Sequence, residues 1–186
     1  MTDSAERYNP SMDVEEAVTS LAPGLLRFCT GLVRSVPEGE DLAQEALASL
    51  VRYWRRSGPP DSPAAFVYAV ARRQAFRLHR RLRRFVGLEA VEDAHAPRPG
   101  PDSSAQDRQE LARALLALES LSASDREAIL MAATGDLSTD EAAKIIGVSP
   151  AAFKMRVHRA RRRLLDYLGM EHDRGTEDLE GARARS

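Results

Sequence analysis

Lysine and arginine side chains are concentrated in two segments that contain no acidic residue. Side chains of this kind are best suited to neutralising phosphate groups. Residues 62–88 hold seven arginines, and residues 142–165 hold seven lysines or arginines, although the whole chain carries a net charge of only -1. Residues 89–141, between them, hold 12 acids against 4 bases. Such segregation predicts two separate contacts with a polyanion, with two solvated helix faces as the alternative.

The second basic segment follows a tight turn between two short helices. Ser138 and Glu141 have the spacing of a capping box, so a helix begins at 138, and Gly147 is suited to the left-handed turn that ends it. Ser149 followed by Pro150 then starts the next helix. Helices joined so tightly must cross steeply, which is the helix-turn-helix arrangement that projects its second helix into a DNA major groove.

The second of these helices has an outward face whose residues are first small and then basic. The apolar positions 153, 157, 160, 164 and 168 are expected to face inward. Small residues allow close approach to the groove, while basic side chains reach base edges and phosphates. A helical hairpin packed inside a bundle is the alternative. The expected DNA contacts are Ser149, Ala151, Ala152, Lys154, Met155, Arg156, His158, Arg159, Arg161 and Arg162.

Helices must position both basic segments, because apolar residues recur at helical spacing along most of the chain. A first helix is predicted over 14–32, with a kink or break near Leu21 because Pro23 lies inside it. A second opens at Pro37, and a third runs from Pro63 to about Phe85. No segment alternates for long with the period of a strand. The predicted fold class is therefore all-α.

The helical periodicity stops between Gly87 and Gln106, where prolines cluster with glycine, serine and aspartate. So long a stretch without a helical pattern is uncommon inside a compact domain. We therefore expect two small helical domains joined by a flexible linker, with a polar, disordered tail at the end. The expected boundaries are 10–86 for the first domain, 87–106 for the linker, 107–168 for the second domain and 169–186 for the tail.

Enzymatic chemistry has little support in the sequence. There is no glycine-rich phosphate loop, no HExxH and no Cys/His ligand pair, and the four histidines are scattered, so no catalytic residue, metal or cofactor is expected. No apolar run is long enough to cross a bilayer, which argues against membrane insertion. The single cysteine, Cys29, falls in an apolar stripe and is interpreted as a buried thiol in a reducing compartment, the cytoplasm.

Two motifs resemble those of one family. Residues 137–164 resemble region 4 of the bacterial sigma factors, and specifically the extracytoplasmic-function (ECF) group, with its LS-x-x-E stretch, G-V-S turn and K-x-R-x-x-R-A-R-x-x-L helix. Residues 39–45, Gly-Glu-Asp-Leu-Ala-Gln-Glu, resemble the A-E-D-L-x-Q-E signature of region 2 in the same group. The two motifs occur in the family's order.

The resemblance implies a function for each half of the chain. In this family region 2 binds core RNA polymerase and the minus-10 promoter element, and region 4 reads the minus-35 element. Asp41, Gln44 and Glu45 form one polar stripe that would then contact core polymerase. The residues that would contact the minus-10 element are Arg72, Arg73, Arg77, Arg80 and Arg81. An anti-sigma factor is a further partner that the resemblance raises, and no residue identifies it.

Two residues depart from the family's pattern for the third helix. Arg73 and Arg77 stand where the family usually has asparagine and aspartate. We hypothesise a stronger grip on phosphate together with an altered base preference in the minus-10 element.

Two other classes of protein remain as alternatives. An autonomous helix-turn-helix regulator that binds duplex DNA without polymerase would explain residues 137–165 and would leave residues 39–84 unexplained. An adaptor would use its arginines on an acidic protein, and the salt dependence of binding would distinguish it from a DNA-binding protein.

Overall fold

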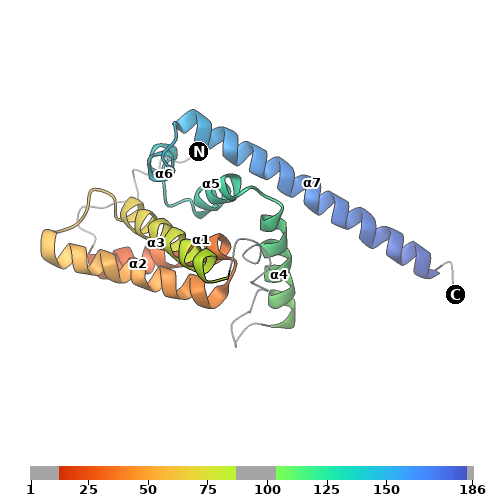
Figure 1. Ribbon diagram of the computed structural model, residues 1–186, viewed down its shortest axis with the longest axis horizontal. Coiled ribbons are helices and arrows are strands. Elements are labelled where there is room, and N and C mark those ends of the chain that lie inside the picture. The colour runs from red at the N-terminus through yellow and green to blue at the C-terminus, as the bar shows by residue number, and fades with distance from the viewer. Residues whose placement is uncertain (1–12, 87–103, 184–186) are drawn as a thin grey trace.

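A computed structural model describes the chain over residues 13–86 and 104–183 (Figure 1). Within these ranges it contains helices and no strand, which confirms the all-α prediction. None of the described helices is both long and apolar enough to cross a membrane. The helices are α1 (Val14–Val33), α2 (Val36–Ser57), α3 (Pro63–Val86), α4 (Ala105–Glu119), α5 (Ala123–Thr134), α6 (Thr139–Ile146) and α7 (Pro150–Arg183).

Helices α1, α2 and α3 form an N-terminal bundle around a core of fully buried side chains. Phe28 and Tyr68 meet edge to face with their ring centroids 5.2 Å apart, and Leu25, Leu50 and Val67 fill the space around them. Burying such side chains is the main stabilising contribution in a bundle of this size. The bundle therefore holds the outward faces of α2 and α3 in fixed orientations.

Helix α1 runs as one helix from Val14 to Val33 with Pro23 inside it, so the chain does not break near Leu21. The loss of one backbone hydrogen bond at proline is local. Leu21 and Leu25 are both buried, so packing on either side of the proline holds the helix together.

Helices α4 to α7 form a C-terminal unit whose bounds differ from the expected ones at two places. Helix α4 begins at Ala105, within the expected linker, because Ser104 and Asp107 form a capping box. Helix α7 continues to Arg183, whereas a disordered tail was expected from 169. The sequence after 168 contains glycines and no proline, so nothing in it forces the helix to end. The rest of the expected linker, 87–103, lies outside the described residues.

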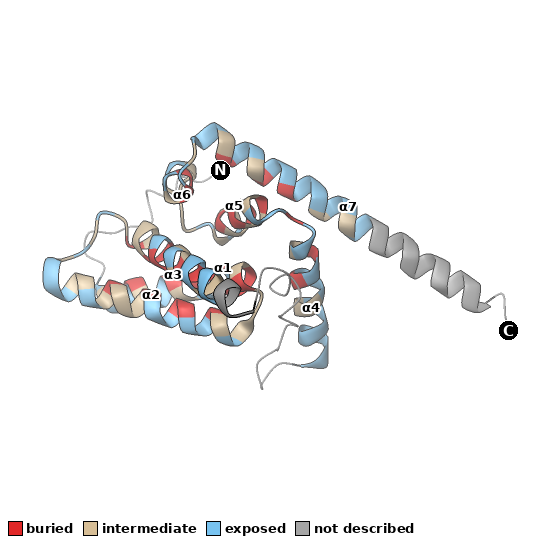
Figure 2. Ribbon diagram, in the orientation of Figure 1, coloured by how far each residue is buried: buried red, intermediate tan, exposed pale blue. Residues whose placement is uncertain are grey.

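The two halves of the chain pack directly against each other. Helix α5 lies on α1, and α6 lies on α3, so that α5 sits between the N-terminal bundle and α7 (Figure 1). Buried residues of the bundle and of the C-terminal unit belong to one continuous apolar cluster, whereas the outer faces of α2 and α7 are largely exposed (Figure 2). The linker prediction did not anticipate this contact.

Candidate nucleic-acid interface

The capping groups at residues 138–152 build the predicted helix-turn-helix. The Ser138 hydroxyl accepts a hydrogen bond from the Glu141 amide at 3.2 Å, and the Glu141 carboxylate accepts one from the Ser138 amide at 2.8 Å. Gly147 ends α6 with a φ of 73°, a conformation that favours glycine. The Ser149 hydroxyl then accepts from the Ala152 amide at 3.2 Å and caps α7. The predicted turn is confirmed.

The carboxylate of this capping box is held in its charged form. Burial of Glu141 alone would raise its pKa, but hydrogen bonds from Ser62 and from Ser138 outweigh burial, and the pKa lies below its ordinary value. Ser62 belongs to the turn before α3, so the cap of α6 also contacts the N-terminal bundle.

Helix α7 presents the small and basic face that the sequence predicts. Phe153, Val157 and Ala160 are buried against the other helices. Ala152 and Arg156 are half-buried. The remaining predicted contact residues are exposed: Ser149, Ala151, Lys154, Met155, His158, Arg159, Arg161 and Arg162.

Leu168 does not face inward as expected, because its side chain is 51% exposed. Helix α7 has by then extended beyond the body formed by the other helices (Figure 1). Leu165, one turn earlier, is also exposed, so the inward stripe of α7 ends at the half-buried Leu164.

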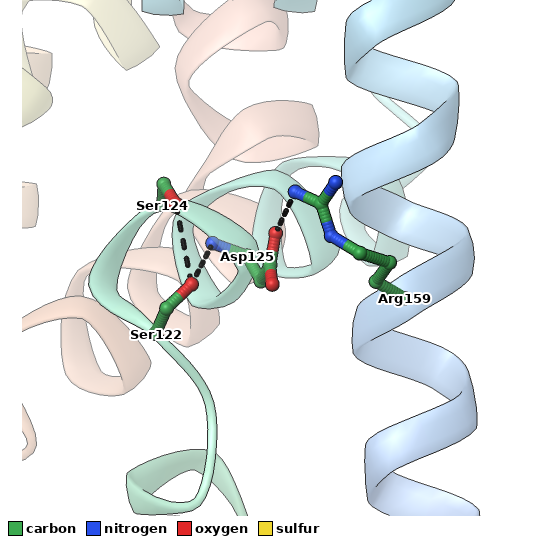
Figure 3. Close-up of polar contacts among 4 residues, drawn as sticks. All are labelled: Ser122, Ser124, Asp125 and Arg159. Atoms are coloured by element: carbon green, nitrogen blue, oxygen red, sulfur yellow. Dashed lines mark hydrogen bonds and ion pairs between the residues drawn. The ribbon is translucent and has the colours of Figure 1, made fainter.

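Arg159 has a structural contact as well as an exposed position (Figure 3). Its Nη2 donates to Oδ1 of Asp125 at 2.8 Å, and the Asp125 side chain is only 5% exposed. The Asp125 amide in turn donates to the hydroxyl of Ser122, which caps α5, at 3.2 Å. Burial would raise the pKa of Asp125, but the hydrogen bonds from Arg159 and Ser122 outweigh it and lower the pKa. Arg159 therefore anchors α7 on α5.

The arginines of α3 divide into an exposed set and one paired residue. Arg73, Arg77, Arg80 and Arg81 are exposed along the helix. Arg72 is half-buried: its guanidinium lies 4.7 Å from the centroid of the Phe76 ring, and its Nε donates to Glu127 of α5 at 2.5 Å. Four of the five arginines predicted to contact the minus-10 element are therefore exposed, whereas Arg72 forms an ion pair with Glu127 of the same chain.

The polar stripe predicted on α2 is exposed. Asp41, Gln44 and Glu45 face away from the bundle, whereas the apolar residues Leu42, Ala46 and Leu50 on the same helix are buried. Glu45 also accepts from Arg52 Nη2 at 2.6 Å, but both side chains are more than half exposed, and such surface pairs contribute little to stability.

Several polar residues that contact across the fold were not anticipated. Tyr68 is fully buried, and its hydroxyl donates to Asp136 Oδ2 at 2.6 Å. Burial, followed by this hydrogen bond, raises the pKa of Tyr68. Glu127 and Asp136 lie 55 and 68 residues from their partners, and no local spacing signals such pairs.

The expected buried thiol is confirmed. Cys29 is fully buried in α1, and burial raises its pKa to about 12, so at neutral pH the thiol is protonated and poorly reactive. Within the described ranges, no group of three or more histidine, cysteine, aspartate or glutamate side chains could hold a metal ion.

Comparison with known proteins matches each half of the chain to a family profile. Residues 17–85 match the family profile described as Sigma-70 region 2, and residues 111–164 match the profile described as Sigma-70, region 4. The chain is similar to the ECF RNA polymerase sigma factor ShbA of Streptomyces griseus, with 33% identity over 156 residues, covering 76% of this chain and 80% of the relative. It is also similar to the ECF RNA polymerase sigma factor SigD of Mycobacterium tuberculosis, with 28% identity over 163 residues, covering 82% and 76%.

A solved structure has a similar arrangement of helices. The sigma factor RpoE of Bartonella quintana, crystallised in complex with the anti-sigma factor NepR, superposes with a TM-score of 0.65 and 25% identity. The superposition covers 83% of this chain and 96% of that one.

Proposed function

The chain belongs to the ECF group of RNA polymerase sigma factors, and we propose how its three exposed surfaces divide that work. It binds core RNA polymerase and directs the enzyme to specific promoters. An autonomous helix-turn-helix regulator is not favoured, because such a protein would leave the match of residues 17–85 to region 2 unexplained.

The first surface, the outward face of α7, would read the minus-35 element. The observation that supports it best is the continuous exposed face from Ala151 to Arg162 on the second helix of the helix-turn-helix. Lys154 lies in the first turns of α7, where such helices contact base edges, and Arg161 and Arg162 lie further along to contact phosphates. Arg159 would contact a phosphate only with the part of its guanidinium that Asp125 leaves exposed.

The second surface, the exposed arginines of α3, would hold the minus-10 element. Arg73, Arg77 and Arg80 are spaced one turn apart and all exposed, so they form a track of positive charge suited to the phosphates of a single strand. Arg73 and Arg77 replace the family's asparagine and aspartate, and both would add phosphate contacts while changing the base that is preferred.

The third surface, the polar stripe Asp41, Gln44 and Glu45 on α2, would contact core polymerase. This assignment leaves the chain without a catalytic role of its own, since it acts by binding. Its place of action would be the cytoplasm, where core polymerase and DNA are found. An anti-sigma factor is a further proposed partner, in line with the anti-sigma factor bound to the related RpoE.

Transcription in vitro tests the function and delivers the promoter. Purified bacterial core RNA polymerase is incubated with a fragment library of the source genome, with and without this protein, and the transcription start sites are mapped. We expect starts that depend on the protein and share a two-part upstream motif. If no such starts appear and the protein alone binds duplex DNA, an autonomous regulator is the better assignment.

The arginine replacements on α3 can be tested on the promoter found in this way. Arg73→Asn is compared with wild type on templates that carry each base at each minus-10 position. We expect weaker binding together with a changed order of preferred bases. If both the preference and the affinity stay the same, the proposed role of Arg73 is wrong.

A further inference from the structure

Phe76 on α3 is an exposed aromatic residue that the three proposed surfaces do not include. Its side chain is 51% exposed, whereas every other aromatic side chain that the structure describes is buried or half-buried. The rings of Tyr53 and Phe66 pack on each other with their centroids 5.0 Å apart, and Trp54 packs against the core. Single exposed apolar residues are common on protein surfaces, so the exposure of Phe76 alone does not assign it a role.

The position of Phe76 within the exposed arginines of α3 does point to a role. Phe76 follows Arg73 by three residues and precedes Arg80 by four, and at 3.6 residues per turn these spacings place all three side chains on one face of the helix. The next residue, Arg77, is also exposed. Arg73 and Arg80 thus lie about 5 Å and about 6 Å from Phe76 along the helix axis. A DNA strand whose phosphates follow these arginines passes over the Phe76 ring.

The Phe76 ring is held in place by Arg72. The guanidinium carbon of Arg72 lies 4.7 Å from the ring centroid, which is the distance of a cation–π contact. Arg72 is itself fixed, because it forms an ion pair with Glu127, whose side chain is only 7% exposed. The exposed part of the ring is therefore presented in one orientation before any ligand binds, and such preorganisation lowers the entropy cost of binding.

A flat apolar ring among cations matches the chemistry of single-stranded nucleic acid. Proteins that bind single strands combine aromatic side chains, on which bases stack, with basic side chains along the phosphates. In duplex DNA a protein reaches the edges of the bases in the grooves, while the base faces are covered by their neighbours in the stack. Residues 58–62, in the turn between α2 and α3, include no aromatic residue, so this turn offers no alternative ring for stacking.

We propose that Phe76 is the residue of α3 on which an unpaired base of the minus-10 strand stacks. This inference rests on the proposed assignment of the minus-10 element to α3. Arg73, Arg77 and Arg80 bind phosphates, which duplex and single strand both carry. The ring gains its contact only after a base pair has opened. Phe76 therefore favours the opened strand over the duplex, and it does so for any base, because every base has a face that can stack.

Binding of single-stranded DNA to the full-length protein, both alone and assembled on core RNA polymerase, tests this role. The probe is a dye-labelled strand of about 12 thymidines, used single-stranded and annealed to its complement, and affinity is measured by fluorescence anisotropy over a range of salt concentrations. Phe76→Leu keeps an apolar residue that favours helix but removes the aromatic face. Phe76→Trp supplies a larger aromatic face. Leu116→Ala truncates another exposed apolar side chain, 46% exposed on α4, and is the control.

We expect Phe76→Leu to weaken single-strand binding on the order of tenfold without changing the salt slope, because stacking neutralises no phosphate. Phe76→Trp should restore the affinity, and duplex affinity should stay at the wild-type value in both variants and in the control. Arg77→Gln should instead reduce the salt slope by about 0.7. Trp54 is the only native tryptophan, so the emission that Phe76→Trp adds reports on position 76. In the protein alone, the single strand should quench this added emission and the duplex should not.

Wild-type affinity in Phe76→Leu would overturn the stacking role. So would a loss that Phe76→Trp does not restore, or an equal loss on the duplex. Each of these results leaves the arginines of α3 as the proposed minus-10 surface. If wild type binds no single strand in either form, the stacking role and that surface fail together. Failure of wild type to support transcription would count against the proposed function alone, because binding by the protein alone needs neither polymerase nor a promoter.

Discussion

Replacing Arg159 should destabilise the C-terminal unit as well as weaken DNA binding, and this distinguishes it from its neighbours on α7. Arg159→Gln removes the cation that lies 2.8 Å from Asp125, whose side chain is 5% exposed. The carboxylate would then remain largely buried, with the Ser122 hydroxyl and the more distant charge of Arg163 as its remaining favourable neighbours. A charge left in this way carries much of its desolvation cost without compensation.

The expected loss of unfolding free energy follows from the exposed fractions of the Arg159 and Asp125 side chains. Breaking a fully buried ion pair costs about 3–5 kcal/mol, whereas an exposed pair is worth at most about 1 kcal/mol. The Asp125 side chain is 5% exposed and the Arg159 side chain is 53% exposed, so solvent screens one partner and not the other. We therefore expect Arg159→Gln to cost about 1–2 kcal/mol of unfolding free energy.

Hydrogen exchange of the amides in α5 and α7 is the suitable assay, because it reports the opening of this unit within the whole chain. A double-mutant cycle with Asp125→Asn should give a coupling energy of about 1 kcal/mol between the two side chains. Arg161→Gln is the matched control: Arg161 is exposed on the same helix, and its loss should change stability by less than about 0.5 kcal/mol. Equal effects of Arg159→Gln and Arg161→Gln, with no coupling to Asp125, would refute the reasoning.

Three other changes have defined outcomes. Gly39→Ala should destabilise the N-terminal bundle by about 2 kcal/mol or more in urea unfolding, since its Cβ would lie 2.7 Å from backbone atoms of Thr30, which cannot move aside as a side chain can. The folded pKa of Asp125 lies below its ordinary value of 3.8. The stabilising contribution of this carboxylate is therefore present above pH 3.8 and is lost as the pH falls through the folded pKa. The difference in unfolding free energy between wild type and Asp125→Asn should accordingly shrink in acid. Lys154→Gln should weaken minus-35 binding and reduce the slope of log affinity against log salt by about 0.9 if the lysine neutralises one phosphate.

Local patterns in the sequence were sufficient for the elements that carry the DNA-contact residues. The capping box at Ser138, the glycine at 147 and the cap at Ser149 act over three or four residues, and the structure contains each of them. Helix periodicity likewise predicted which side chains of α7 are buried as far as Val157 and Ala160. It failed at Leu168, because burial there depends on whether another helix is present to cover it.

The contacts of Arg72 and Arg159 show what local sequence patterns do not predict. Both were predicted to contact DNA, since a basic residue on an outward helix face is suited to phosphate. In the structure each one also binds an acid from a distant segment: Glu127 is 55 residues from Arg72, and Asp125 is 34 residues from Arg159. Charge patterning identified the cations but not their partners.

The sequence by itself determined the helices, the helix-turn-helix and the basic faces, because caps, turns and apolar stripes depend on residues a few positions apart. Only the tertiary structure decided that the acidic stretch of one half contacts the other half of the same chain. Arg34 meets Glu119 across 85 positions, and Tyr68 meets Asp136 across 68. Pairings at such separations depend on how whole helices pack, and packing is governed by the shape and charge of complete surfaces.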